Sequence, residues 1–398
     1  MTDGFRWHSA ARLFDSAGEE VPRVHVGKGT RSPVVLPDSA QGLAAAIGHP
    51  AYRIGAPDQP PPDPQDQPIL ETLTSGSTGQ PRRICRTQAS WTASFAVNAT
   101  LGIGPGARVA TLGRLIHSLS LYGAVEGLHL GAEVHHLADL RPDRQRRALA
   151  ARRITHLYAT PAQLRLLLGP GTVPDLRLIL VGGSKLDPVL RTGLQSLAPI
   201  AQIREFYGAA ETSFITLADE TTPAASVGRP YPGVDLHLGP GGEVWVRSPY
   251  LFLGYGADAG RNLQRRQVTA ARWRDGWLSV GEIGELRDGF LYLKGRAGRM
   301  VKVADQNVFP EEIEALLETL PGVTRAAVLP VPDPLRGHAL VAVVQGDAGH
   351  EVGILVTLRE KLGPTRSPKA LIWRDDWPVL ASGKTDLKAL EASLAWPA

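Results

Sequence analysis

The sequence predicts an α/β fold: a large N-terminal domain with helix-covered, mostly parallel sheets, then a small α+β C-terminal domain. Two observations lead to this prediction. Between residue 69 and about residue 225, apolar runs typical of strands alternate with helical patterns, as in parallel sheets covered by helices. After residue 225, short strands joined by Gly-rich turns, such as "GVDLHLGPGGEVWVRSP", indicate antiparallel structure instead.

The individual elements follow from these patterns. In the first part, strands are expected at "PILETL", "RVATLG", "ITHLYAT" and "LRLILVGG", and helices at "SLSLYGAVEGLHLG", "PAQLRLLL" and "DPVLRTGLQSLA". From residue 300, one strand is expected before the helix "PEEIEALLETL". The strands "RAAVLPV" and "HALVAVVQ", the helix "VGILVTLREKL", the extended "KALIWRD" and the helix "DLKALEASL" complete a region of about 100 residues.

Residues 57–68, "PDQPPPDPQDQP", hold six prolines in twelve positions. Proline at this density forbids helix and central strand and favours an extended spacer. The sequence therefore predicts a linker here that separates a short N-terminal segment from the main body.

Composition narrows the class of protein. There are 43 basic and 39 acidic residues, and many of the arginines lie in "RPDRQRRALAARR" (141–153). A solvated helix face is favoured there over a nucleic-acid surface. The single Cys85 is interpreted as a structural thiol. Neither an apolar signal-peptide region nor a run of eighteen apolar residues occurs, so we expect a cytoplasmic protein without a membrane contact.

The segment "TSGSTGQ" after "PILETL" consists of small and hydroxylated residues. By itself it fits a flexible linker or a phosphate cradle equally well, because glycines let backbone N–H groups approach an anion and hydroxyls add donors. The common nucleotide-loop pattern G-x-x-x-x-G-K-[ST] fails here, since Pro81 stands where its second glycine would be.

Several separated stretches together resemble the adenylate-forming superfamily, which contains acyl- and aryl-CoA ligases, luciferases and adenylation domains. The resemblance extends in order and spacing from about residue 69 to the C-terminus. It is carried by "TSGSTGQPR", "YGAAET", "VGRPYPGVDLHL", "GEVWVRSPYLFLGY", "DGWLSVGEIGELRDGFLYLKGRAGRMVKV", "PEEIEALLETLPGVTRAAVLPVPD" and "LASGKTDL".

The resemblance implies that the chain binds ATP and Mg²⁺. Thr78 and Glu211 would contact the metal. Glu282 and Arg296 would bind the ribose, and Lys384 would reach the charge that develops between the acid and the α-phosphate. The residues implied to bind the rest of the nucleotide are Thr74, Ser75, Gly76, Ser77, Thr78, Gly79 and Arg82 at the phosphates, the turn with Gly183 and Ser184 at the adenine, and Tyr207, Gly208 and Ala209 of "YGAAET" at the adenine or acyl pocket.

The chain departs from the family pattern at several positions. Arg82 replaces the usual lysine, so a planar guanidinium group replaces a compact ammonium group of the same charge. Glu282 replaces aspartate, and Gly298 occupies the hinge, where glycine tolerates a large backbone rotation. Few residues precede the phosphate loop, so the chain resembles a compact member. The resemblance implies an N-terminal core over residues 1–296 and a mobile C-terminal domain over 297–398.

The substrate is constrained by "GRLIHSLSLYG" (113–123), which resembles the family's substrate loop and places His117 on its histidine. No aspartate occurs there to bind an α-ammonium group, so an aryl or acyl acid is favoured over an amino acid. The acceptor would be coenzyme A or a carrier protein's phosphopantetheine arm. Ala304 stands where coenzyme A ligases favour a small glycine, which slightly favours the carrier protein. A non-catalytic family member and a nucleic-acid-binding protein remain as alternatives.

Overall fold

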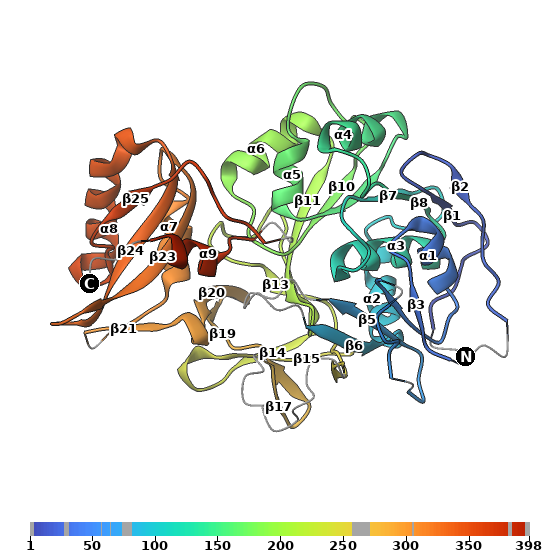
Figure 1. The fold of residues 1–398 in the computed structure, drawn as a ribbon, viewed down its shortest axis with the longest axis horizontal. Helices are drawn as coiled ribbons and strands as arrows, with labels where there is room; N and C mark the ends of the chain where they lie inside the picture. The colour runs from blue at the N-terminus through green and yellow to red at the C-terminus, as the bar shows by residue number, and fades with distance from the viewer. Residues whose placement is uncertain are drawn as a thin grey trace. The chain divides into compact units, whose positions relative to one another are not determined.

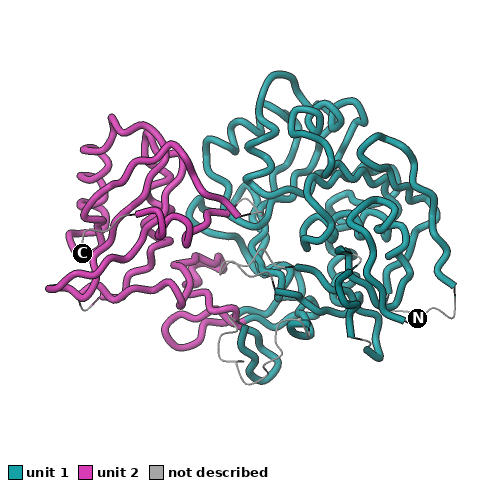
Figure 2. Tube along the Cα trace, viewed as in Figure 1, with its two compact units in different colours: residues 1–76, 80–236, 246–278 teal, residues 77–79, 237–245, 279–398 magenta. Residues whose placement is uncertain are grey.

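The computed structural model describes residues 4–27, 32–56, 58–63, 65–73, 82–256, 271–304, 306–380 and 384–394. The chain divides into two compact units (Figure 2). Apart from three residues of the 74–81 segment, unit 1 contains residues up to 236 and 246–278, and unit 2 contains 237–245 and 279–398. The expected boundary at residue 296 stays a prediction; by compactness, the residues from 279 onward already group with unit 2.

Unit 1 is built on a nine-stranded sheet with the order β13-β12-β11-β10-β9-β7-β8-β1-β2. The six central strands run parallel to their neighbours, in the order β1, β8, β7, β9, β10 and β11. The outer strands are antiparallel: β2 pairs with β1, β12 pairs with β11, and β13 pairs with β12. The strands are β1 (Arg12–Phe14), β2 (Glu20–Val21), β7 (Arg108–Thr111), β8 (Glu133–His136), β9 (His156–Ala159), β10 (Leu178–Val181), β11 (Gln202–Ala209), β12 (Ser213–Leu217) and β13 (Arg229–Pro230).

Helices cover both faces of this sheet (Figure 1). On β9, Leu157 packs in one core cluster with α4, α5 and α6, while the ring of Tyr158 lies against Gly123 of α3 on the other face. This alternation follows from the two-residue period of a strand. The helices of unit 1 are α1 (Ala40–Ala46), α2 (Ala89–Ala99), α3 (Ser118–Leu130), α4 (Pro142–Ala151), α5 (Pro161–Leu167) and α6 (Pro188–Leu197).

Local sequence explains the ends of these helices. Pro161 and Pro188 occupy first-turn positions, where no N–H is needed. Thr160 and Gln163 form a reciprocal capping box on α5, and Asp187 caps α6. α3 ends at Gly131, whose φ of 100° is left-handed. The helices and strands expected in this part of the chain are therefore confirmed.

A second, five-stranded sheet in unit 1 has the order β16-β6-β5-β4-β3. β4 pairs with β5 in parallel across the proline-rich segment, and β1 pairs with β8 of the larger sheet. The interpretation of residues 57–68 as a spacer before the main body was therefore wrong, because the N-terminal strands belong to both sheets. The strands of the five-stranded sheet are β3 (Val34–Leu36), β4 (Ala51–Ile54), β5 (Ile69–Leu73), β6 (Arg83–Thr87) and β16 (Gly254–Tyr255).

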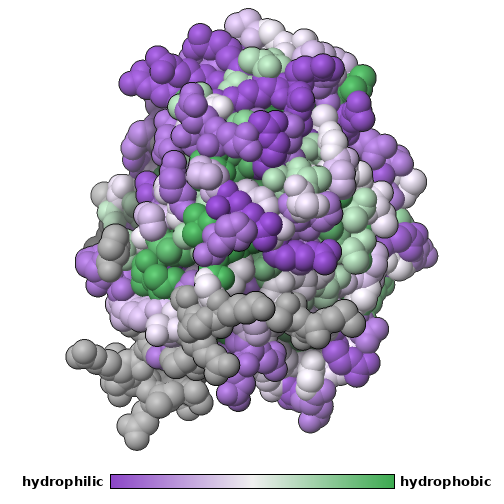
Figure 3. Space-filling view, turned by 90° about the vertical axis from the view of Figure 1, so that its right-hand side faces the viewer, coloured by the Kyte–Doolittle hydropathy of each residue, from purple (hydrophilic) through white to green (hydrophobic). Residues whose placement is uncertain are grey.

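The side of unit 1 with the N-terminal strands exposes mainly hydrophilic residues, with smaller apolar areas among them (Figure 3). No helix among the described residues is long and apolar enough to cross a membrane.

Further along the chain, a four-stranded sheet has the order β14-β15-β18-β17. Its strands are β14 (Asp235–Leu238), β15 (Val244–Arg247), β17 (Arg272–Arg274) and β18 (Trp277–Ser279).

Unit 2 contains a three-stranded sheet, β23-β24-β25, and two hairpins, β19–β20 and β21–β22. Ala326 and Val328 of β23 pack in the cluster with α7 and α8, while Ala327 and Leu329 face α9. Two strands precede α7 where one was expected. The elements are β19 (Glu282–Arg287), β20 (Phe290–Arg296), β21 (Val301–Val303), β22 (Gln306–Val308), α7 (Pro310–Leu317), β23 (Val323–Asp333), β24 (Gly337–Gly346), α8 (Glu351–Arg366), β25 (Leu371–Trp373) and α9 (Leu387–Ser393). The α/β fold predicted from the sequence is confirmed.

Candidate nucleotide and acid site

The expected phosphate loop lies between β5 and β6, which form an antiparallel pair with Leu73 opposite Arg83. Residues 74–79, including Thr78 of the expected metal site, lie outside the described residues. Arg82 is half-buried, and its guanidinium carbon lies 5.5 Å from the centre of the Tyr255 ring. Tyr255 belongs to β16, the strand that pairs with β6. Arg82, the first described residue after the loop, thus packs against β16.

Glu211 lies in a tight turn between β11 and β12. A Cβ on Gly208 would lie 1.7 Å from the Ser213 carbonyl oxygen, so only glycine permits this approach. Ser213 itself has a φ of 56°, an unusual value for a non-glycine residue. The Thr212 hydroxyl accepts a 2.9 Å hydrogen bond from the Ala209 N–H and closes the turn. The "YGAAET" motif therefore forms a constrained turn that fixes its own backbone.

The Glu211 side chain is half-buried and its carboxylate is oriented by Tyr255. The Tyr255 hydroxyl donates to Glu211 Oε1 at 2.9 Å, and burial together with the neighbouring carboxylate raises the pKa of this tyrosine. The Glu211 carbonyl accepts the Phe252 N–H at 2.9 Å. Arg82, Tyr255 and Glu211 thus lie together in unit 1 beside the strand that follows the expected phosphate loop.

Gly183, Ser184 and Tyr207 come from neighbouring parallel strands. β10 and β11 pair with Val181 opposite Glu205, so both lead toward the same carboxyl edge of the sheet. Gly183 has a φ of 101°, and a Cβ on Gly182 would lie 2.2 Å from the Phe206 ring. The turn is therefore pressed against β11. Ligands of open α/β sheets bind outside such carboxyl ends, which supports the nucleotide assignment of this edge.

His117 immediately precedes α3 and forms an isolated parallel bridge with Leu73, the last residue of β5. The Leu73 N–H donates to the Ile116 carbonyl at 3.0 Å, and the hydroxyls of Thr72 and Ser118 lie 2.8 Å apart. Burial lowers the pKa of His117, while a backbone hydrogen bond with Leu73 acts in the opposite direction. The fold thus brings His117 to the strand end from which the expected phosphate loop starts.

Unit 2 holds the other three predicted site residues. Glu282 and Arg296 lie opposite each other in the β19–β20 hairpin, with Nε 2.9 Å from Oε1. Glu282 is 8% exposed, so the arginine offsets the burial of its carboxylate. Lys384 is exposed, and residues 381–383 before it lie outside the described residues. On either side of them, Val379 bridges Thr385 and the Leu380 N–H donates to the Lys384 carbonyl at 2.8 Å. The Glu282–Arg296 pair and Lys384 come from different segments of unit 2.

The donor set around Glu211 fits magnesium. Mg²⁺ is usually held by one or two carboxylates together with water and substrate phosphates, rather than by a cluster of protein ligands. Glu211 supplies a carboxylate oriented by Tyr255. Among the described residues there is no group of three or more His, Cys, Asp or Glu side chains that could hold a metal ion by themselves.

Two residues of this region were missed by sequence reasoning. Tyr255 lies within the quoted stretch "GEVWVRSPYLFLGY", but nothing local indicates that its hydroxyl reaches Glu211. Arg86 is 1% exposed and donates to the Ala210 carbonyl at 2.5 Å. The only local signal for Arg86 is a charged residue at an inward position of the strand "RICRT".

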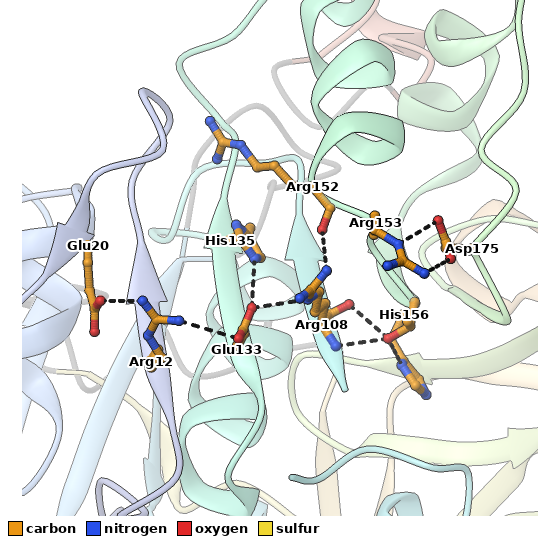
Figure 4. Close-up of polar contacts among 10 residues, drawn as sticks. Arg12, Glu20, Arg108, Glu133, His135, Arg152, Arg153, His156 and Asp175 are labelled. Carbon is orange, nitrogen blue, oxygen red and sulfur yellow. Dashed lines mark hydrogen bonds and ion pairs between the residues drawn. The ribbon is translucent and has the colours of Figure 1, made fainter. Parts of the chain in front are cut away.

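The arginine-rich segment 141–153 makes contacts within unit 1. Arg152 donates to the carbonyls of Asp15 and Ser16 at 2.9 and 2.7 Å, and Arg153 pairs with Asp175 at 3.1 Å. Figure 4 shows Arg153 directed at Asp175, and Arg108 between Glu133 and the carbonyl of Arg152. Arg152 and Arg153 therefore have hydrogen-bond and ion-pair partners inside unit 1, as the interpretation of this segment as an ordinary helix surface requires.

The family model described as AMP-binding enzyme matches residues 10–256, and the one described as AMP-binding enzyme C-terminal domain matches residues 312–384. The uncharacterized acyl-CoA ligase YhfT of Bacillus subtilis is 31% identical over 89% of this chain and 73% of its own length. Indoleacetate–CoA ligase of Aromatoleum aromaticum is 29% identical over 82% of this chain and 68% of its own length.

Solved structures share the fold. o-Succinylbenzoate CoA synthetase (MenE) of Bacillus subtilis, in complex with its acyl-adenylate, has a TM-score of 0.69 at 23% identity and covers 81% of this chain and 68% of its own. Amide bond synthetase McbA of Marinactinospora thermotolerans has a TM-score of 0.70 at 24% identity, over 96% of this chain and 80% of its own.

Proposed function

This chain belongs to the AMP-binding enzyme family, and we propose that it is an AMP-forming acid–thiol ligase. It activates an aryl or acyl carboxylic acid with ATP as an acyl-adenylate and then transfers the acyl group to a thiol. The observation that carries this proposal is the β11–β12 turn: it holds Glu211, through Tyr255, beside the strand that follows the phosphate loop. That turn lies inside the region matched by the family model.

The reaction has two steps. The carboxylate oxygen forms a bond to the α-phosphorus, the bond from that phosphorus to the bridging oxygen breaks, and pyrophosphate leaves. The thiol sulfur then attacks the acyl carbon, loses its proton and displaces AMP. Both partners of the first step are anions, so positioning and charge neutralisation carry most of the catalysis.

The residues divide this work between them. Arg82 and residues 74–79 bind the phosphates. The edge formed by Gly183, Ser184 and "YGA" of residues 207–209 takes the adenine, while Glu282 and Arg296 take the ribose. Lys384 stabilises the charge that develops at the carboxylate and α-phosphate. Magnesium, when bound, neutralises part of the triphosphate charge, and Glu211 and Thr78 are the residues that would hold it.

The acid is expected to lack an α-amino group. The segment 113–123 contains no aspartate, and the related ligase from Aromatoleum is named for indoleacetate. Burial lowers the pKa of His117, so this ring is neutral near pH 7 and suits an uncharged aryl or acyl group. Coenzyme A is the acceptor named for these relatives. A carrier protein's phosphopantetheine arm ends in the same thiol and is the second acceptor we propose to test.

Pyrophosphate exchange into ATP, measured with a panel of benzoic, cinnamic, hydroxybenzoic, indoleacetic, fatty and amino acids, tests this function. We expect exchange that depends on an aryl or acyl acid and on magnesium. Exchange with amino acids alone would overturn the assignment of the substrate class. If no acid supports exchange although the protein binds ATP, the chain is a non-catalytic binding member of the family.

Glu211→Gln tests the proposed metal contact. The substitution keeps the size of the side chain but removes its charge, so we expect the Mg²⁺ concentration for half-maximal exchange to rise by roughly 10–100-fold. Glu220→Gln is the matched control, because that carboxylate is 78% exposed in the same unit. An unchanged magnesium dependence in Glu211→Gln would show that Glu211 does not contact the metal.

A further inference from the structure

Arg86 is a buried arginine that joins two segments expected to hold the nucleotide. It lies on β6, four residues after Arg82, and is 1% exposed. β6 is the return strand of the hairpin that carries the phosphate loop. The Arg86 side chain extends from this strand toward the turn that carries Glu211.

The guanidinium of Arg86 holds that turn at two points. Nη2 donates to the Ala210 carbonyl at 2.5 Å, and Nη1 donates to the Ser213 hydroxyl at 2.6 Å. These two residues flank Glu211 and Thr212. Ser213 has a left-handed backbone, a conformation that persists only where its surroundings hold it.

The same guanidinium also contacts two other segments. Nη1 donates to the Tyr250 carbonyl at 3.2 Å and to the Ser90 hydroxyl at 3.3 Å, and the group lies 5.4 Å from the centre of the Trp91 ring. Tyr250 precedes Phe252, whose N–H donates to the Glu211 carbonyl. One side chain therefore connects the loop hairpin, α2, the Glu211 turn and the chain leading to Tyr255.

The charge of Arg86 is not offset by a contacting carboxylate. Its hydrogen-bond acceptors are carbonyl and hydroxyl oxygens, and among the described residues it forms no ion pair. Burial lowers its pKa to about 10, while the nearby Glu211 charge acts in the opposite direction, so the group stays charged at neutral pH. A buried cation of this kind costs stability that an apolar side chain would not.

We propose that Arg86 is a positioning residue for the nucleotide site: its guanidinium fixes the Ala210–Ser213 turn against the phosphate-loop hairpin and so holds the Glu211 carboxylate in place. The proposal rests on the proposed function, in which Glu211 contacts the metal. Arginine suits this role because the two terminal nitrogens of its rigid guanidinium bond the two flanks of the turn separately, whereas lysine carries all of its donors on one nitrogen.

Arg86→Met and Arg86→Lys test the proposal in the full-length protein. We expect Arg86→Met to raise the Mg²⁺ concentration for half-maximal pyrophosphate exchange by roughly tenfold or more, because small displacements in a site have large effects on rate. Arg86→Lys keeps the charge and should recover part of this loss. Thioester formation from a preformed acyl-adenylate needs no metal at Glu211 and should stay within about threefold of wild type.

A double-mutant cycle separates positioning from general stabilisation. If Arg86 acts through Glu211, Arg86→Met combined with Glu211→Gln will need no more magnesium than Glu211→Gln alone. Leu190→Ala, which removes packing in the core under α6, is the control for lost stability. Additive effects in the cycle would overturn the proposal, as would a magnesium dependence that shifts equally in Leu190→Ala and Arg86→Met. If the wild-type protein shows no exchange with any acid, the proposed function is overturned instead.

Discussion

The two motifs expected to carry the charge of the adenylation step, one in each unit, are held differently. Glu211 in unit 1 is half-buried, its carboxylate accepts the Tyr255 hydroxyl, and its turn is held by the buried Arg86. Lys384 in unit 2 is exposed; its carbonyl accepts the Leu380 N–H, and the indole N–H of Trp377 donates to Thr385 Oγ1 at 3.0 Å.

This difference connects structure to expected behaviour. Around Glu211 the position of the side chain depends on buried charge, so substitutions there should change stability and activity together. Lys384 is exposed, so we expect that it can be removed with little effect on folding. An exposed lysine also suits the rotation of a mobile C-terminal domain about Gly298 that the family resemblance implies. Gly298 lies in the short 3₁₀ turn Ala297–Arg299.

Arg53→Met should produce the largest loss of stability and tests how far the folding of unit 1 depends on paired buried charge. Arg53 is fully buried on β4 and pairs with the buried Glu71, with Nη1 2.8 Å from Oε2. Removing it leaves a buried carboxylate without its cation, which costs about 3–5 kcal/mol of unfolding free energy. Urea unfolding measures this. Arg53→Met combined with Glu71→Leu should recover much of the loss, and a single variant as stable as wild type would contradict the account.

Lys384→Ala tests the second half of the comparison, the exposed lysine of unit 2. Loss of a positioned cation at a developing charge costs about 3 kcal/mol, or roughly a hundredfold in the rate of adenylate formation. The unfolding midpoint should stay unchanged, and preformed acyl-adenylate should still yield thioester at near-normal rate. Lys388→Ala, an exposed lysine on α9, is the control. Equal loss of both half-reactions, or a lowered midpoint, would indicate a structural lysine.

Glu126 offers a pH test of buried charge in unit 1. It is fully buried on α3, accepts hydrogen bonds from Asn98 and Tyr122 at 2.9 and 3.0 Å, and burial raises its pKa from 4.5 to about 7. The folded protein therefore keeps a proton that the unfolded chain loses, so this group lowers stability as pH rises from about 4.5 to 7, by up to about 3 kcal/mol.

The difference in unfolding free energy between wild type and Glu126→Gln isolates this effect, because contributions from histidines cancel. We expect the variant to gain stability relative to wild type as the pH is raised from 5 to 8. Glu360→Gln, an exposed glutamate on α8, should give no such trend. Parallel pH profiles for wild type and Glu126→Gln would show that Glu126 does not titrate in this range.

Ala304→Gly should give the smallest effect. Ala304 has a φ of 51° in the turn between β21 and β22, where Val303 pairs with Gln306. Glycine accepts this conformation without a side-chain clash, so we expect a gain of about 0.5–1 kcal/mol in unit 2, measured by thermal unfolding. A loss of stability in Ala304→Gly would show that the backbone at Ala304 is not strained. If the methyl group narrows the path of the thiol, the same variant should also use coenzyme A faster.

The sequence predicts well what is encoded locally. α5 and α6 follow from their prolines and capping residues, and the β19–β20 hairpin follows from short strands joined at the Gly-containing turn of "GEIGELRDGFLYLKG". Long-range pairing is different. Residues 57–68 suggested a spacer, but β4 and β5 on either side of them lie side by side in one sheet.

Arg86 shows the same limit at the site. Its acceptors Ala210, Ser213 and Tyr250 are 124 to 164 residues away along the chain. No local pattern encodes such contacts, because they depend on how β6 and β12 are brought together. The sequence identified Glu211, Tyr207 and Lys384 as candidates through motifs, but it could not indicate which side chains hold them in position.

Transfer of oxygen from the acid to AMP tests the central claim most directly. With a carboxylic acid labelled with heavy oxygen in its carboxylate, formation of an acyl-adenylate and its transfer to a thiol must leave one labelled oxygen on the phosphate of AMP. Mass spectrometry of the nucleotide product should therefore show labelled AMP together with unlabelled pyrophosphate. Production of ADP, or of AMP without label in the presence of a consumed acid, would contradict the account.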